Sequence, residues 1–420
     1  MERSQKAILV GVNLNNQHDF QYSMEELANL AAACNVDTVG VMTQKLHRVN
    51  TSHYIGTGKI QELSALIEQH EANLVIFNDE LSPSQIRNLE AALECKVIDR
   101  TILILDIFAE RAKTKEAQLQ VDVAQLQYML PRLIGLRKSL GRQSGGVGIR
   151  NRGSGEKKLE LDRRKIEERI TALNKELEIL VSRRQIQRKQ RKKNEVPVVC
   201  LVGYTNAGKS TLMNAMVEKF NQSINKRVFE KDMLFATLET SVRNIKLPDN
   251  KSFLLTDTVG FINKLPHHLI KAFRSTLEEV AEADLLIHVV DYSIPEYHQH
   301  ISVTNETLKE LGADHIPTIY AYNKADLVDG EFPKIQSDSV YLSAKQKMGM
   351  DELIHLIRNH IFQDFTQCEM LIPFDQGQLV TYFNENAHIL STDYEDRGTK
   401  LTLECKIADF EKYQQYVIQS

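Results

Sequence analysis

The sequence lacks any run of 18 or more apolar residues, so it predicts no membrane-spanning helix. Its start, Met1 to Lys6, leads into a short mixed segment that lacks the apolar core and the cleavage site of a secretory signal. Cysteine is scarce, and the five cysteines fit neither a disulfide framework nor the spacing of zinc ligands. These absences favour a cytoplasmic protein with buried free thiols. The cysteines, which lie far apart in the sequence, are Cys34, Cys95, Cys200, Cys368 and Cys405.

The charge of the chain is unevenly distributed. The 420 residues leave room for about three domains, and the net charge is only −4. Between Lys113 and Lys193, however, 22 basic residues face 9 acidic ones, which gives +13 and leaves −17 for the rest. A basic block in an acidic chain favours a polyanionic partner, although a solvated helical face would give the same count.

Residues 1–112 alternate between short apolar runs and helical patterns, which predicts a small parallel α/β domain. The predicted strands are 7–12, 38–42, 74–78 and 96–98, and the predicted helices are 24–34, 59–70, 82–93 and 101–113.

Gly56-Thr57-Gly58-Lys59 in this domain imitates the end of a phosphate loop. Ile60 stands where a hydroxyl would hold magnesium, and the earlier glycine of the motif is missing. We interpret it as a glycine-rich turn that enters a helix. A second, weaker nucleotide site remains the alternative.

Residues 113–194 predict a basic helical hairpin. Apolar residues follow a heptad spacing in two stretches, and the glycine-rich segment 141–155 between them is unsuited to regular helix. We expect an antiparallel hairpin with the stripes as its core, in a monomer. The stripes are Leu119, Val123, Leu126, Leu130 and Leu133, then Leu159, Ile166, Ile170, Leu173, Leu177 and Leu180.

The tip of this hairpin combines glycine with arginine and predicts an RNA contact. Arginine forks match phosphates, and glycine lets the backbone approach closely. A disordered linker is the alternative reading. The predicted RNA-binding residues are Arg137, Lys138, Arg142, Arg150, Arg152, Lys157, Lys158, Arg163 and Arg164.

Residues 203–210 form a complete G-x-x-x-x-G-K-[ST] phosphate loop. The loop follows an apolar strand and leads into a helix, which is the context that this motif requires. Backbone N–H groups of such a loop converge on the β-phosphate. We predict that Lys209 bridges the β- and γ-phosphates and that the Ser210 hydroxyl binds Mg²⁺. The predicted nucleotide contacts are Gly203, Tyr204, Thr205, Asn206, Ala207, Gly208, Lys209, Ser210 and Thr211.

A switch segment is predicted after this loop. It needs a hydroxyl that completes the magnesium shell and senses the γ-phosphate, for which Thr237 is the candidate and Thr240 the substitute. The predicted contacts of this segment are Phe235, Ala236, Thr237, Leu238 and Glu239.

A D-x-x-G sequence then ends the next apolar strand. We expect Asp257 to hold Mg²⁺ through water and the Gly260 amide to bond the γ-phosphate, with Thr258 and Val259 beside them. The predicted catalytic residues are therefore Lys209, Thr237 and Gly260. Phe261 follows, where Ras-like GTPases carry a glutamine that orients water. A phenyl ring cannot do this, so intrinsic hydrolysis should be slow, and a partner or another loop must place the water.

Asn323-Lys324-Ala325-Asp326 predicts selection of guanine. The Asp326 carboxylate can accept both N1–H and N2–H₂ of guanine, whereas adenine would leave it unpaired. The Lys324 stem can cover the base, and Asn323 can tie loops together. Ser343, Ala344 and Lys345 complete the predicted pocket, with the Ala344 amide facing guanine O6. Five motifs in order, each at a strand end, predict a Mg²⁺-dependent GTPase that uses GTP and GDP over residues 195–365. Residues 366–420 predict a small α+β domain without visible chemistry.

With these residues in place, nearly the whole chain resembles the HflX family of translation-factor-related GTPases. The resemblance rests on the phosphate loop, the switch segment and Asp257–Phe261, together with the segments 54–59, 99–101, 125–126, 145–148, 152–153 and 162–164. Two of its departures are Ser154, where the family pattern R-G-P-G-E has proline, and Glu239, where aspartate is usual.

The resemblance implies a ribosome-associated GTPase. Such proteins bind the large ribosomal subunit, direct the hairpin loop toward the peptidyl transferase centre, and split or rescue stalled ribosomes under stress, with hydrolysis stimulated by the subunit. Two other functions stay open: a GTPase switch in large-subunit assembly or RNA modification, and a GTP-gated adaptor for a protein. Neither DNA nor a membrane is expected as a partner.

Overall fold

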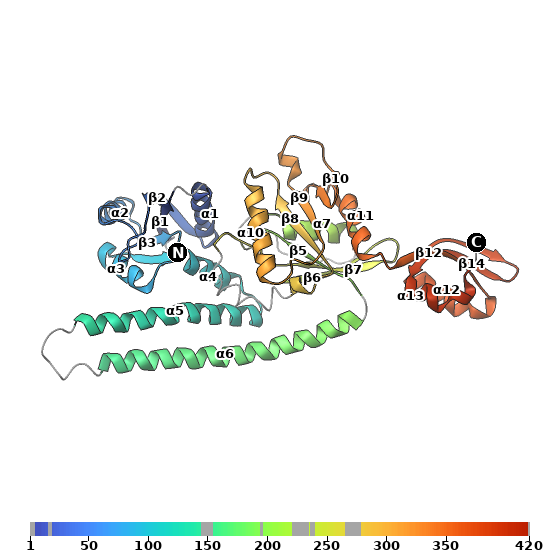
Figure 1. Ribbon diagram of the computed structural model, residues 1–420, viewed down its shortest axis with the longest axis horizontal. Helices are drawn as coiled ribbons and strands as arrows, with labels where there is room; N and C mark the ends of the chain where they lie inside the picture. The colour runs from blue at the N-terminus through green and yellow to red at the C-terminus, as the bar shows by residue number, and fades with distance from the viewer. Residues whose placement is uncertain are drawn as a thin grey trace. The chain divides into compact units, whose positions relative to one another are not determined.

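The computed structural model describes residues 5–15, 19–143, 154–193, 196–220, 235, 240–264 and 279–418. Within these ranges, only the backbone is described for residues 133–143, 154–160 and 183–193. These residues form two compact units. The first combines the N-terminal α/β domain and the hairpin with Phe235, Asn263 and Lys264, and the second combines the central and C-terminal domains. Figure 1 gives the labels used below.

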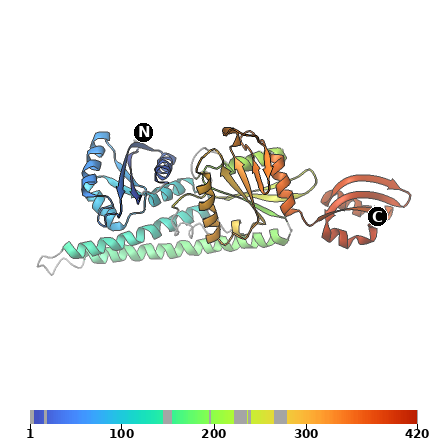
Figure 2. The same ribbon diagram turned by 45° about the horizontal axis from the view of Figure 1, so that its top comes forward.

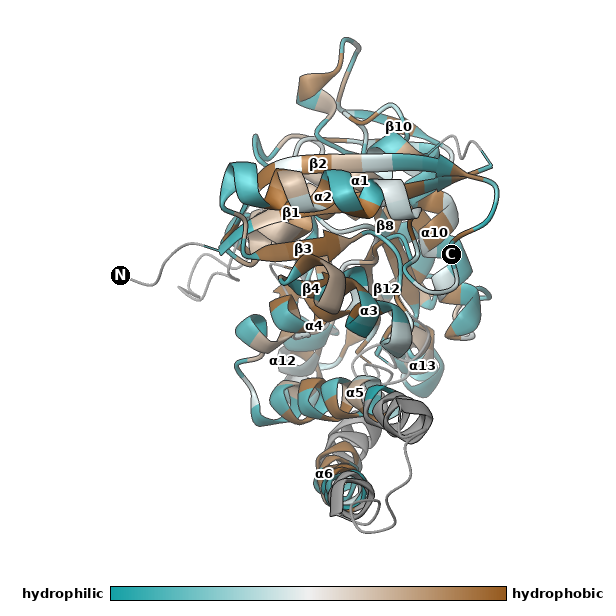
Figure 3. Ribbon diagram, turned by 90° about the vertical axis from the view of Figure 1, so that its left-hand side faces the viewer, coloured by the Kyte–Doolittle hydropathy of each residue, from teal (hydrophilic) through white to brown (hydrophobic). Residues whose placement is uncertain are grey.

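The N-terminal domain is a parallel sheet between helices, as the sequence predicts. Its strands lie in the order β2-β1-β3-β4, and all neighbouring pairs are parallel. Figure 3 shows hydrophobic residues along β1 and β3, which are buried in the core of this domain. The elements are β1 Gln5–Leu14, α1 Phe20–Ala33, β2 Val36–Leu46, α2 Thr57–His70, β3 Leu74–Phe77, α3 Pro83–Leu93, β4 Lys96–Asp99 and α4 Arg100–Arg111.

Two of these helices begin where the sequence supplies a cap. Ser82 precedes α3, accepts a hydrogen bond from the Gln85 N–H and is followed by Pro83, which suits the first helical position. Asp99 caps α4 by accepting from the Ile102 N–H at 3.0 Å. The predicted elements of this domain therefore all exist, with ends that differ by a few residues.

Two long helices, α5 Lys115–Gln143 and α6 Ser154–Lys193, form the predicted hairpin. Figures 1 and 2 both show them running alongside each other. Leu119, Val123 and Leu173 are buried between them, so part of the heptad pattern is hairpin core. Helix extends over 141–143 and from 154 onward, so the segment predicted to be non-helical was drawn too wide. Residues 144–153 lie outside the described residues.

Replacing Leu173 with alanine should destabilise the hairpin by about 2–5 kcal/mol, because it leaves a cavity at a fully packed site. Leu173 is 1% exposed, whereas Ile179 on the same helix is 56% exposed, so Ile179→Ala is the matched control. Urea unfolding followed by circular dichroism measures both. Equal midpoints for the two variants would contradict a packed hairpin core at Leu173.

The central domain is a seven-stranded sheet in the order β10-β11-β9-β8-β5-β7-β6. The five inner strands, β11 to β7 in that order, are parallel, and the edge strands β10 and β6 are antiparallel to their neighbours. The elements are β5 Val198–Val202, α7 Lys209–Phe220, β6 Ser241–Lys246, β7 Ser252–Asp257, β8 Leu285–Asp291, α10 Tyr297–Glu310, β9 Thr318–Asn323, η1 Ala325–Leu327, β10 Lys334–Gln336, β11 Ser339–Tyr341 and α11 Met350–Ile361.

The C-terminal domain packs a three-stranded antiparallel sheet, β12-β14-β13, against short helices. Its last α-helix, α13, ends at Lys412, and a 3₁₀ turn follows. The elements are β12 Phe365–Ile372, η2 Phe374–Gln376, α12 Gly377–Asn386, β13 His388–Glu395, β14 Gly398–Lys406, α13 Ile407–Lys412 and η3 Gln414–Tyr416.

All five cysteines are free thiols, but only Cys200 and Cys405 are buried. The prediction of buried thiols is wrong for the other three, which are half-buried. Cys368 and Cys405, distant in sequence, have sulfur atoms 3.9 Å apart because their strands are paired. Within the described residues, every helix is too short or too polar to cross a membrane.

Candidate nucleotide-binding site

The predicted motifs meet at one edge of the central sheet. Five neighbouring parallel strands point their carboxyl ends to the same side, where ligands of open α/β sheets bind. Gly203 follows β5, and β7 ends at Asp257. β9 ends at Asn323, and Ser343 comes two residues after β11. The sheet therefore brings these four sequence segments together.

The backbone of the phosphate loop needs its glycines. Gly203 has φ +139°, and a β-carbon there would lie 2.2 Å from the Val289 carbonyl oxygen. Gly208 has φ +94°, and its β-carbon would lie 2.2 Å from Asn323 Nδ2. Both conditions exclude a side chain, since L-residues rarely adopt such φ values. The loop is thus held close to the neighbouring strand ends.

Lys209 lies at the start of α7 and is almost fully buried. Its ammonium group donates to the carbonyl oxygens of Gly203 at 3.0 Å and Tyr204 at 2.8 Å. Burial lowers the pKa of Lys209 to about 8, and the nearby Asp257 carboxylate opposes that shift. An anionic ligand would stabilise the buried ammonium, and the N-terminus of α7 also favours a negative charge at this place.

Ser210 and Asp257 form a pair of oxygen donors beside this lysine. The Ser210 hydroxyl donates to Asp257 Oδ2 at 2.6 Å, and Asp257 is fully buried. Hydroxyl and carboxylate oxygens are the ligands that Mg²⁺ prefers in proteins. This donor set fits the predicted magnesium site.

The D-x-x-G loop lies directly on the phosphate loop. The Thr205 N–H donates to the Phe261 carbonyl at 2.8 Å, and the Phe261 N–H donates to the Gly203 carbonyl at 3.1 Å. A β-carbon on Gly260 would lie 2.8 Å from Lys209 Nζ, so this glycine permits the close approach. The Thr258 hydroxyl donates to the Leu201 carbonyl at 2.7 Å. The Phe261 ring is buried, as suits a side chain that cannot hydrogen-bond water.

Asn323 joins the phosphate loop to the base pocket. Its amide nitrogen donates to the Ala207 carbonyl at 2.9 Å, and its oxygen accepts the Ala344 N–H at 2.9 Å. The Ala344 amide was predicted to face guanine O6, so that atom would have to share this donor with Asn323. Asp326 is half-buried and accepts from Gln346 Nε2 at 3.3 Å. Ser343 is buried and Lys345 is exposed.

The sequence interpretation missed Asp291, which ends β8 between the strands of the phosphate loop and Asn323. It is 5% exposed and accepts from Lys324 Nζ at 2.6 Å. It also accepts from the N–H and the hydroxyl of Ser293. Asp291 therefore orients the lysine that was predicted to cover the base. A carboxylate at the end of an apolar strand was the available signal.

The predicted switch segment is described at one residue. Phe235 is buried and packs edge-on against Phe108 of the N-terminal domain, with ring centroids 4.7 Å apart. Ala236, Thr237, Leu238 and Glu239 lie outside the described residues.

The predicted RNA-binding residues divide in the same way. Arg163 and Arg164 lie on α6, and Arg163 pairs with Glu167 at 2.9 Å. Arg150 and Arg152 lie outside the described residues, as do the side chains of Arg137, Lys138, Arg142, Lys157 and Lys158.

Gly56-Thr57-Gly58-Lys59 is the entry to α2, as interpreted from the sequence. Gly56 is the N-cap residue of this helix. The Lys59 ammonium pairs with Glu62 one turn later, and the Gly56 N–H donates to Gln44 Oε1 at 3.0 Å. These contacts engage the Lys59 ammonium and the Gly56 N–H, two groups that a phosphate would otherwise meet.

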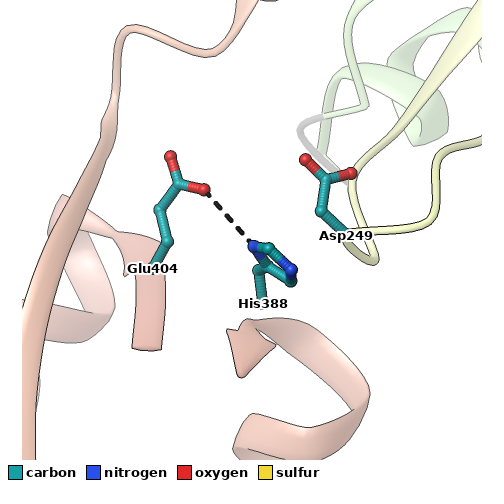
Figure 4. A group of neighbouring side chains, drawn as sticks. All are labelled: Asp249, His388 and Glu404. Atoms are coloured by element: carbon teal, nitrogen blue, oxygen red, sulfur yellow. Dashed lines mark ion pairs between the residues drawn. The ribbon is translucent and has the colours of Figure 1, made fainter. Parts of the chain in front are cut away.

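Asp249, His388 and Glu404 form a separate group of possible metal ligands, drawn in Figure 4. Two cations already balance its carboxylates: Lys251 Nζ lies 2.8 Å from Glu404, and Arg358 lies 3.1 Å from Asp249. A third cation would be repelled at this spacing. We interpret the group as an ion-pair network that joins the turn between β6 and β7 to the C-terminal domain.

The fold and this site define a P-loop GTPase. Family models cover most of the chain: "GTP-binding GTPase N-terminal" matches residues 21–109, "GTP-binding GTPase Middle Region" matches 111–191, and "50S ribosome-binding GTPase" matches 198–324. The chain is 44% identical over 414 residues to GTPase HflX of Caldanaerobacter subterraneus subsp. tengcongensis, covering 99% of this chain and 94% of that protein. It is 37% identical over 418 residues to GTPase HflX of Escherichia coli, covering 98% and 96%.

The chain therefore belongs to the HflX family of GTPases. Among solved structures, it is similar to a GTP-binding protein from Sulfolobus solfataricus in complex with GDP, at 23% identity and a TM-score of 0.45. That match covers 86% of this chain and 99% of the other.

Proposed function

We propose that this GTPase binds the large ribosomal subunit and uses GTP-dependent switching to split or rescue stalled ribosomes in the cytoplasm. The observation that carries the proposal is the meeting of Lys209, Asp257 and Asn323 at one sheet edge, in a chain whose central domain matches a 50S ribosome-binding family. We infer that residues 1–112, 113–194, 195–365 and 366–420 act as four modules, and that the basic hairpin meets ribosomal RNA.

The residues of the site suggest how hydrolysis would proceed. Lys209 leaves the carbonyl oxygens of its loop to meet the β- and γ-phosphates, where it stabilises the charge of the transition state. Ser210 and Asp257 would hold Mg²⁺, which neutralises phosphate charge when bound. The Gly260 amide and Thr237 would sense the γ-phosphate, and Asp326 would select guanine.

Because Phe261 cannot orient water, the proposal predicts that purified large subunits strongly stimulate steady-state GTP hydrolysis. The measurement compares phosphate release by the protein alone and with subunits. In the Lys209→Ala variant, the stimulated rate should be about 10²–10³-fold lower. An unstimulated wild-type rate would contradict the proposal and favour an adaptor or an assembly role.

The hairpin tip is tested separately. Replacing residues 141–155 with a glycine–serine segment of equal length should abolish subunit binding and splitting while GDP affinity stays unchanged. Phosphate contacts also predict that wild-type binding weakens steeply with salt. Sucrose-gradient sedimentation measures both. Intact splitting by the replaced chain would refute the role of the tip but not the GTPase assignment.

A further inference from the structure

Arg100, at the start of α4, is a buried cation whose partners come from three separate stretches of sequence. It is 2% exposed and forms an ion pair with the carboxylate of Glu26, which is 3% exposed. Its Nη1 donates to Asn78 Oδ1 at 3.0 Å, and its Nη2 donates to the Asn263 carbonyl at 3.2 Å. A buried guanidinium requires such partners, because an unpaired one is costly. Arg100 thus fixes the backbone at Asn263.

The next residue is fixed to the same domain. Lys264 Nζ lies 2.6 Å from Asp79 Oδ1, and both side chains are partly exposed, at 32% and 23%. The Tyr54 hydroxyl hydrogen-bonds the same aspartate, and burial raises the pKa of Tyr54, so it remains a donor. Phe235, from the switch segment, packs on Phe108 of this domain. Residues on both sides of the D-x-x-G strand therefore contact the N-terminal domain.

Asp99, next to Arg100, contacts the hairpin. Its carboxylate is fully buried and accepts from the Tyr128 hydroxyl and from Arg132 Nη2, the latter at 3.2 Å, and both residues belong to α5. It also accepts the N–H groups of Leu81 and Ile102 at 3.0 Å. Arg100 thus contacts Asn263, and its neighbour Asp99 contacts α5.

The segment before Asn263 is held at the nucleotide site. Phe261 exchanges two backbone hydrogen bonds with the phosphate loop, and only Ile262 separates it from Asn263. Two peptide steps span at most about 7 Å, so the chain can absorb only a small movement of the D-x-x-G loop before Asn263 is displaced. Loss of the γ-phosphate is the event expected to move this loop.

We propose that Asp79 and Arg100 are positioning residues for the nucleotide switch: they hold the segment after the D-x-x-G loop and, through Asp99, transmit its displacement to α5. This coupling uses one contiguous set of contacts, and each nucleotide state would bias the same element. It rests on the GTPase assignment alone and is independent of ribosome binding.

The test reverses the exposed ion pair in the full-length protein. Hydrogen exchange at the Leu81 and Ile102 amides and along α5 is compared between GDP and a non-hydrolysable GTP analogue. The wild type should show a nucleotide-dependent difference. Lys264→Asp and Asp79→Lys should each lose it, and the double variant, with the charges exchanged, should regain it. A merely structural ion pair would also respond to the charge exchange, but it would change hydrogen exchange equally in both nucleotide states.

Two controls complete the experiment. All variants should keep wild-type affinity for a fluorescent GDP, since the pair lies outside the nucleotide contacts. Exchanging the charges of the Lys59–Glu62 ion pair on α2 should leave the nucleotide-dependent difference intact. The proposal is overturned if the wild type shows no difference, or if Lys264→Asp retains it. Neither outcome depends on large-subunit binding, so this proposal can fail while the proposed function stands.

Discussion

Replacing Asp326 by asparagine is expected to lower the affinity for GDP and GTP by about 10⁴-fold, because a site built to hydrogen-bond its ligand rejects a mismatched partner that strongly. Guanine offers two donors, N1–H and N2–H₂. The asparagine keeps one acceptor but turns a donor toward the other guanine donor. Xanthine carries a carbonyl oxygen where guanine has its N2 amino group, and this oxygen can accept from the asparagine. The variant should therefore gain affinity for xanthine nucleotides.

The matched control is Asp329→Asn, an exposed aspartate three residues later in the same loop. It removes the same charge from the same region without touching the predicted base contact. Competition of GDP and XDP against a fluorescent nucleotide measures both variants. Equal losses in the two, or undiminished GDP binding by the Asp326 variant, would refute the assignment of the base pocket.

Replacing Gly208 by alanine is expected to destabilise the central domain and abolish nucleotide binding. A non-glycine residue at φ +94° costs about 1–3 kcal/mol. The alanine β-carbon would also lie 2.2 Å from Asn323 Nδ2 and would push this amide away. A buried amide left without its hydrogen bonds costs about 1–3 kcal/mol more. Asn323 connects Ala207 with Ala344, so the phosphate loop and the base pocket should be disrupted together.

The chain contains its own control for this substitution. Gly58 also precedes a lysine, but it lies inside α2, and a β-carbon there would meet nothing within 4 Å. Gly58→Ala should leave GDP binding unchanged and stabilise the protein by up to about 1 kcal/mol. Thermal unfolding and GDP titration compare the two variants. Similar behaviour of both would mean that the glycine of the phosphate loop is not constrained as the structure indicates.

These two Gly-Lys pairs show what the sequence could predict. Ser210 distinguished the phosphate loop from the pair at Gly58, where Ile60 follows Lys59, because magnesium needs an oxygen ligand. Strand ends were predictable because apolar runs stop at polar motif residues, which put Gly203, Asp257 and Asn323 at one edge. The heptad spacing similarly predicted Leu119 and Leu173 as hairpin core.

Other contacts depended on tertiary structure that no local pattern contains. Asp291 ends an apolar strand without a motif around it, and its role follows only from the neighbouring position of Lys324. Arg100 lay between a predicted strand and a predicted helix, in a segment noted only for its family resemblance, and the fold alone placed Glu26 and Asn263 beside it. The Cys368–Cys405 proximity arose in the same way, since antiparallel pairing joins residues whose sequence distance carries no signal.

The contacts of Arg100 also have a consequence for the order in which the chain is synthesised. Asn263 follows Arg100 by 163 residues, and Lys264 follows Asp79 by 185. At about 5–20 residues per second, these partners leave the ribosome roughly ten to forty seconds after the positions they complete. During that interval the N-terminal sheet can close with Arg100 paired to Glu26, while the place of Asn263 is open to water. A nascent chain stalled before residue 263 would therefore carry a folded but incomplete N-terminal domain.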